Sequence, residues 1–237
     1  MEEITSSFDL KKENIIAFRI VIWAALIYFI VGIVSLLLAM IAVPPVGLSY
    51  PYLDTLRQYP RDYFWQYSAI VMLILYIILN SSLGSTIIAE RKVISNIGLI
   101  FSVMSCVLLI AIYYIQETVV PVSLMNNERD GLALLTQYNP HGLFIALEEV
   151  GYMLMLGTLI TYFFMFRGKD RTEKAIRIVS AISTIGVVIS YIVISLIYGL
   201  EKRDRFEIVI ILFVWIANIL NSFLIYRIFR RKIRELI

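Results

Sequence analysis

The sequence predicts an all-α fold, a bundle of six transmembrane helices that makes the chain a polytopic membrane protein. The first observation is composition, since 60% of the 237 residues are hydrophobic and 16% are charged, against about 45–50% and about 25% in ordinary soluble domains. The second is that the apolar residues gather into six runs of roughly the 20 residues that a helix needs to cross a bilayer. The third is that these runs are apolar on nearly every face, whereas strands of an outer-membrane barrel alternate in polarity. Because a helix satisfies its own backbone hydrogen bonds in lipid, we expect every run to be helical.

The six runs follow one another along a single predicted domain, residues 1–237. They cover residues 20–43, 67–89, 93–115, 142–166, 178–200 and 208–225. Asn139 followed by Pro140 has the form of an N-cap with proline at the first helical position, so we expect the fourth helix to begin there. Between the third and fourth runs, residues 126–138 are expected to form a short surface helix.

Basic residues indicate the orientation of the bundle, because cytoplasmic loops of membrane proteins are enriched in Lys and Arg. Of the 21 basic residues, fifteen fall in the N-terminal segment, the second and fourth connections and the C-terminal segment, and six fall in the other three connections. We therefore expect both termini to be cytoplasmic, in the cell membrane. The basic residues lie between apolar runs rather than on one patch, so the expected partner is the lipid bilayer and not a nucleic acid.

Two adjacent acids in the fourth run, Glu148 and Glu149, are the first candidates for function. An acid at the centre of a span costs about 2.5–3.5 kcal/mol on insertion scales, so we expect these two to face the bundle interior or a polar cavity. Desolvation and mutual repulsion disfavour two ionised carboxylates, so at least one is expected to hold a proton. The structural alternative is that one acid bonds a helix hydroxyl and the other pairs with an outer-loop arginine, namely Arg57, Arg61 or Arg129.

His141 and Tyr152 extend this candidate site, because residues seven or eight and then three or four apart share one face of a helix. His141 would provide a proton entry point or hydrogen-bond partner at the outer mouth, since the ordinary pKa of histidine is about 6.5. It is the only histidine, and Cys106 is the only cysteine, so a zinc centre lacks ligands. With no phosphate-cradling motif either, we expect no metal and no cofactor.

Asn218 and Asn221 form a second polar face on the sixth run, together with Ser222. We interpret them as donors and acceptors of interhelical hydrogen bonds, which are worth about 0.6 kcal/mol on average. Contact with a solute is the alternative. A stripe of small residues on the third run predicts close packing between helices, and its members are Ser95, Gly98, Ser102 and Ser105.

The paired glutamates resemble part of the signature of the intramembrane CAAX-type proteases, in which an arginine follows four residues after the second glutamate and histidines lie on later helices. Met153 stands at that position and no histidine follows His141, so protease function is not expected. The plan of six spans, with His141-Gly142 and then Gly151-Tyr152 entering the fourth, resembles uncharacterised integral-membrane families of bacteria and archaea. That resemblance concerns the overall plan and implies no particular activity.

These observations predict a non-enzymatic multi-pass membrane protein that binds or transports a small solute. Glu148 or Glu149 would be its protonatable gate or ligand contact. The alternative is a non-catalytic membrane subunit that docks a partner membrane protein. An enzyme acting on lipid would need a nucleophile or a metal set, which these residues do not assemble.

Overall fold

The computed structural model describes residues 2–42, 48–52, 54–55, 59–168 and 170–236, and every regular element in them is a helix. Six helices in these ranges are long and apolar enough to cross a membrane, which confirms the predicted number. They are α1 (Glu2–Ile41), α2 (Phe64–Ser85), α3 (Lys92–Met125), α5 (Leu143–Met165), α6 (Arg171–Tyr198) and α7 (Arg203–Leu236). The short elements are η2 (Arg61–Tyr63), η3 (Ala89–Arg91), α4 (Leu132–Leu135) and η4 (Gly199–Lys202).

Several helices continue beyond the apolar runs that predicted them, because hydropathy locates the apolar part of a helix and not its ends. The clearest case is α3, which passes through Gln116 and Glu117 and ends at Met125 instead of residue 115. Gln116 is buried yet bonded, since its amide donates to the carbonyl of Leu135 and its Oε1 accepts from the backbone N–H of Gln137 at 3.0 Å. The polar extension of α3 therefore anchors the segment that leads into α5.

The predicted start of the fourth span at Asn139-Pro140 is wrong. The helix α5 begins at Leu143, and Gly142 occupies the N-cap position. Asn139 closes a turn instead, because its Oδ1 accepts from the backbone N–H of His141 at 3.0 Å and its amide donates to the carbonyl of Ala133 at 2.6 Å. The surface helix expected within residues 126–138 is the single turn α4.

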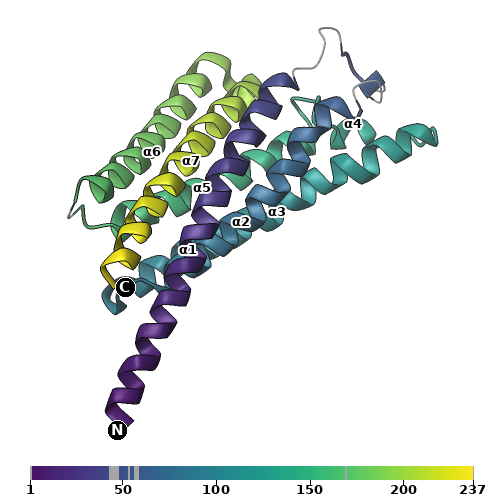
Figure 1. Cartoon of the computed structure of the whole chain (residues 1–237). Helices are drawn as coiled ribbons and strands as arrows, with labels where there is room; N and C mark the ends of the chain where they lie inside the picture. The colour runs from purple at the N-terminus through teal and green to yellow at the C-terminus, as the bar shows by residue number, and fades with distance from the viewer. Residues whose placement is uncertain (1, 43–47, 53, 56–58, 169, 237) are drawn as a thin grey trace.

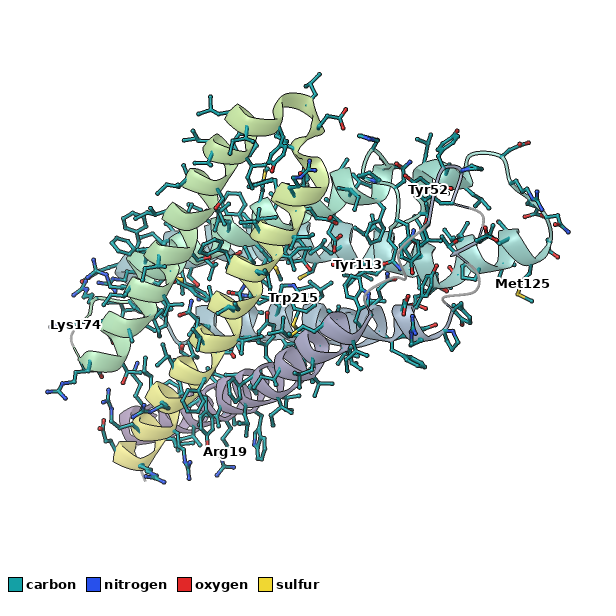
Figure 2. The ribbon with its side chains drawn as sticks, turned by 90° about the horizontal axis from the view of Figure 1, so that it is seen from above. Arg19, Tyr52, Tyr113, Met125, Lys174 and Trp215 are labelled. Atoms are coloured by element: carbon teal, nitrogen blue, oxygen red, sulfur yellow. The ribbon has the colours of Figure 1, made fainter. Side chains whose placement is uncertain are left out.

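The helices form a ring in the order α1, α2, α3, α5, α6 and α7, which a contact between α7 and α1 closes. A further contact joins α5 to α7 across the ring. Both termini lie at the same end of the bundle (Figure 1). Figure 2 shows Arg19 and Lys174 at that end, with Tyr52 and Met125 at the opposite end, as expected for an even number of crossings.

Asp170 starts α6 at the end of the bundle that holds the termini. Its Oδ1 accepts from the backbone N–H groups of Thr172 and Glu173 at 2.8 and 2.9 Å, and Arg231 of α7 donates to its Oδ2. Partial burial raises the pKa of Asp170, but the hydrogen bonds from Arg231 and the two backbone groups outweigh it, so the pKa lies below its ordinary value. The Asp170 carboxylate therefore caps α6 and ties it to the last turns of α7.

Candidate functional site

Glu148 lies inside the bundle, near the start of α5, and 1% of its surface is exposed. The hydroxyl of Tyr113, from α3, donates to Glu148 Oε1 at 2.5 Å. The Tyr152 hydroxyl lies 2.8 Å from the Tyr113 hydroxyl and accepts from Trp215 Nε1, on α7, at 2.7 Å. Figure 2 shows Tyr113 and Trp215 in the interior of the bundle.

These four side chains form a relay of hydrogen bonds with one direction. A tyrosine hydroxyl has a single hydrogen to donate. Because Tyr113 gives its hydrogen to Glu148, the bond between the tyrosines is donated by Tyr152, which in turn accepts from Trp215. Every donor therefore points toward Glu148, and such a chain stabilises negative charge on that carboxyl group.

A second buried acid, Glu207 on the first turns of α7, forms a hydrogen bond with Glu148. Glu207 is 7% exposed. Two ionised carboxylates have acceptors only, so a hydrogen bond between carboxyl groups requires a proton on one of them. Glu148 and Glu207 thus form a pair that holds one proton in the hydrogen-bonded state, and we call them the carboxyl pair.

The carboxyl pair opens onto a cavity of about 430 Å³. The cavity is lined by the end of α1 and the first turns of α5 and α7, so it lies at the end of the bundle opposite the termini. Burial raises the pKa of Tyr138, so its hydroxyl stays neutral at physiological pH. No lysine, arginine or histidine is found among the described residues that line the cavity. Those residues are Ala39, Ala42, Trp65, Gln137, Tyr138, Phe144, Ile145, Glu148, Glu207, Ile208, Ile211 and Trp215.

Close approach of α3 and α5 brings the relay together. A Cβ on Gly151 would lie 2.5 Å from Leu109 Cδ2, so a larger residue here would require the Leu109 side chain to move. The Ser105 hydroxyl crosses the same contact and donates to the Gly151 carbonyl at 2.7 Å. Tyr113 lies two helical turns after Ser105 and therefore faces α5 beside Glu148. The close packing predicted for the small-residue stripe of α3 is confirmed.

The other acid of the predicted pair, Glu149, is half-buried and does not line the cavity. Adjacent side chains on a helix point about 100° apart, so only one of the two can join the relay. His141 precedes α5 and is exposed, with its Nε2 3.7 Å from Glu201 Oε2. Of the stripe expected from His141 to Tyr152, the structure thus brings Glu148 and Tyr152 together and places His141 at the surface.

One half of the structural alternative is found, because Glu148 bonds a helix hydroxyl, that of Tyr113. The arginines expected to pair with the other acid are placed as follows. Arg61 lies 2.6 Å from Asp62, Arg129 donates to the Asn127 side chain at 3.4 Å, and Arg57 lies outside the described residues. Glu148 is instead bonded to a tyrosine and to a second carboxyl group. No arginine is needed to account for its burial.

Asn218 and Asn221 lie on the buried face of α7 and do not line the cavity. Asn221 Nδ2 donates to Ser180 Oγ on α6 at 3.1 Å, which confirms the interhelical bond expected for it. Within the described part of the chain, neither amide atom of Asn218 has a hydrogen-bond partner. Asn218 is therefore a buried polar group next to the site but does not line it.

Glu207 and Tyr113 belong to the site but were not predicted from the sequence. Glu207 follows the charged stretch Glu201–Arg205 and reads as part of a loop, although it precedes Trp215 by eight residues, which places both on one face of a helix. Tyr113 is one of many aromatic residues in an apolar run and carries no local signal. The described residues hold no cluster of three His, Cys, Asp or Glu side chains suited to a metal ion.

Comparison of the chain with family models, with curated proteins and with solved structures found no match in any of the three.

Proposed function

We propose that this chain is an integral membrane protein of the cell membrane that binds a small organic cation in its cavity in exchange for the proton of the carboxyl pair, and moves the cation across the bilayer. One observation carries the proposal: two buried carboxyl groups from different helices share a hydrogen bond beside a cavity whose described lining holds no basic residue. Such a site favours positive charge, which either a proton or a cationic ligand supplies.

Embedding in a bilayer is supported by the six long apolar helices and by their outer faces. On α6, Ile182, Ile185 and Leu196 are largely exposed, as are many other aliphatic side chains around the ring. Monomeric soluble proteins rarely expose apolar patches of this extent, whereas lipid covers them without cost. The excess of basic residues at the end that holds the termini favours a cytoplasmic location for that end, so the cavity faces outward.

The aromatic lining favours an organic cation over an inorganic one. Trp65, Phe144 and Trp215 supply ring faces, and the Trp65 and Trp215 centroids are 6.3 Å apart. Aromatic faces attract organic cations through their quadrupoles and gain further from apolar contact. A metal ion would instead need more oxygen ligands than two carboxyl groups and the neutral Gln137 and Tyr138 provide.

The exchange leaves the charge of the cavity balanced. In the empty site the proton belongs to Glu207, which donates to a Glu148 carboxylate that the tyrosine relay also stabilises. A cation that enters the cavity favours ionisation of both groups, so Glu207 releases its proton to the outer solution and one positive charge replaces another. Return of the proton displaces the cation. Affinity for the cation therefore rises with pH.

Binding of tetraphenylphosphonium, a monovalent apolar cation, tests the proposal. The full chain is purified in mild detergent with Trp23→Phe, because Trp23 is exposed on α1 and the remaining tryptophans, Trp65 and Trp215, both line the cavity. Quenching of their fluorescence then reports occupancy. We expect saturable binding at pH 8 with release of one proton per cation.

Three acid variants separate the cavity from its surroundings. Glu148→Gln and Glu207→Gln should each weaken binding at least tenfold, because either change removes a negative charge beside the cation. Glu149→Gln, an adjacent acid that does not line the cavity, should bind like the parent. Equal binding by all three variants would refute the proposal, and proteoliposome uptake of the same cation against a proton gradient tests transport itself.

The alternative role, a subunit that docks another membrane protein, stays a prediction of the sequence. A monodisperse monomer without retained partner after mild solubilisation counts against it.

A further inference from the structure

A second cavity lies at the opposite end of the bundle, among the connections next to the C-terminus. Its volume is about 250 Å³. The α2–α3 connection, the α5–α6 connection and the last turns of α7 meet there. Its lining consists of Thr86, Ile87, Ile88, Arg91, Met165, Phe166, Arg167, Glu173, Phe229 and Lys232.

Positive charge prevails in this second cavity, since it is lined by three basic residues and one acid, Glu173. Arg167 forms a salt bridge with Glu90, because its Nη2 lies 2.5 Å from Glu90 Oε2. Neither Arg91 nor Lys232 forms a salt bridge with a side chain that the structure describes. Among the described residues, no carboxylate therefore forms a salt bridge with either of these two cations, and both line the concave site.

Both of these cations are held in place by neutral groups. The guanidinium of Arg91 donates to the carbonyl of Met165, the last residue of α5. The ammonium group of Lys232 lies 4.9 Å from the ring centroid of Phe229. A guanidinium group has five N–H donors and an ammonium group three, so each retains donors for an anion.

Apolar side chains form the rest of the lining. Ile87 and Ile88 belong to the α2–α3 connection, Phe166 to the α5–α6 connection and Phe229 to α7. Ile88 is more than half exposed. A site with cations on one side and exposed aliphatic surface on the other matches an amphiphile with an anionic head.

We propose that this cavity binds a phosphate oxyanion, held by Arg91 and Lys232, and that its main source is the headgroup of an anionic phospholipid whose acyl chains cover Ile88. Basic pockets between helices at the cytoplasmic side suit such headgroups. Free phosphate shares the chemistry of the head but gains nothing from the apolar lining. This inference is independent of the cation site at the other end.

Lipid titration of the full chain in detergent tests this inference. Phosphatidylglycerol, phosphatidylcholine and inorganic phosphate are each added, and binding is measured by native mass spectrometry and by the thermal midpoint. We expect phosphatidylglycerol to bind and stabilise, and phosphatidylcholine to do so far less. Arg91→Gln and Lys232→Gln should each weaken phosphatidylglycerol binding roughly fivefold, the effect of one basic residue near an anionic headgroup.

Arg230→Gln is the matched control, because it removes the same charge from α7 at an exposed residue whose Nη1 bonds the Tyr226 hydroxyl outside the cavity. It should bind phosphatidylglycerol like the parent. If Arg91→Gln fails to fold for want of its bond to α5, Lys232→Gln alone decides. The inference is overturned if Lys232→Gln binds like the parent, if Arg230→Gln loses as much, or if the two lipids bind equally. Displacement of the lipid by millimolar phosphate would support binding of an oxyanion and would show that free phosphate is a second ligand of the cavity.

Discussion

Replacing Tyr113 with phenylalanine removes one oxygen atom from the centre of the proposed site and leaves the ring in place. The lost hydroxyl donates to Glu148 at 2.5 Å and accepts from Tyr152 at 2.8 Å. The phenyl ring keeps its edge-to-face contact with Trp65, whose centroid is 5.2 Å away. Any effect of Tyr113→Phe therefore reports on the hydrogen bonds and not on packing.

The size of the loss follows from which partner is left unsatisfied. Tyr152 loses an acceptor but keeps its bond from Trp215. The larger cost falls on Glu148, a charged group that is 1% exposed and loses a donor. A hydrogen bond to a charged group contributes about 1.5–3 kcal/mol, and a bond between neutral groups about 0.5–1.5 kcal/mol. Because Glu148 carries the negative charge in the proposed site, we expect Tyr113→Phe to lower the free energy of unfolding by about 1.5–3 kcal/mol.

Reversible unfolding in mixed micelles with increasing mole fraction of dodecyl sulfate measures this loss. Tyr114→Phe is the control, since Tyr114 is the next residue on α3 and is 62% exposed. We expect it to unfold like the parent. If Tyr113→Phe matches Tyr114→Phe both in stability and in affinity for tetraphenylphosphonium, the Tyr113 hydroxyl does not stabilise a charge on Glu148.

Three further predictions test the exchange, the packing and the α6 cap. Cation affinity should rise about tenfold per pH unit while one proton is displaced per cation. Glu207→Gln should abolish this dependence of affinity on pH. If the dependence persists in the variant, the cation does not exchange with the proton of the carboxyl pair. Gly98→Ala should destabilise the bundle by about 1–3 kcal/mol, the usual cost of overpacking, because its Cβ would lie 2.4 Å from Thr161 Oγ1. Adding Thr161→Ala should restore much of the lost stability. If the double variant unfolds as readily as Gly98→Ala, the clash is not the cause. Asp170→Ala should cost about 1 kcal/mol at pH 7, as loss of an N-cap does. The pKa of Asp170 in the folded protein is below its ordinary value, so this stabilisation is present at neutral pH and is lost as the pH falls through the folded pKa. The stabilities of the variant and the parent should therefore converge in acid. Chemical unfolding at several pH values measures this convergence.

The sequence predicts the helices well because their signal is local. Six apolar runs locate six helices, and small residues such as Gly98 and Ser105 mark where two of them approach closely. The ends of the helices are harder to predict. A polar residue ends an apolar run in the sequence, but the helix continues through it when its side chain has a hydrogen-bond partner. Gln116 is such a case, bonded to the segment after α4.

The site depends on tertiary contacts that the sequence does not display. Glu148 and Glu149 are equivalent by sequence, and only the positions of α3 and α7 decide that Glu148 faces the interior. Its partners come from residue 113 and residue 207, far along the chain on either side. Glu207 could have been suspected from its helical register with Trp215, but its pairing with Glu148 requires the contact between α5 and α7.

Infrared difference spectroscopy tests most directly whether the carboxyl pair holds one proton at neutral pH. The full chain in lipid is compared with Glu207→Gln, and Glu149→Gln is the control. We expect the parent to show the carbonyl stretch of a protonated carboxylic acid, Glu149→Gln to keep it, and Glu207→Gln to lose it. A parent spectrum without that band, or a band that survives in Glu207→Gln at full strength, would show that the carboxyl pair does not hold this proton.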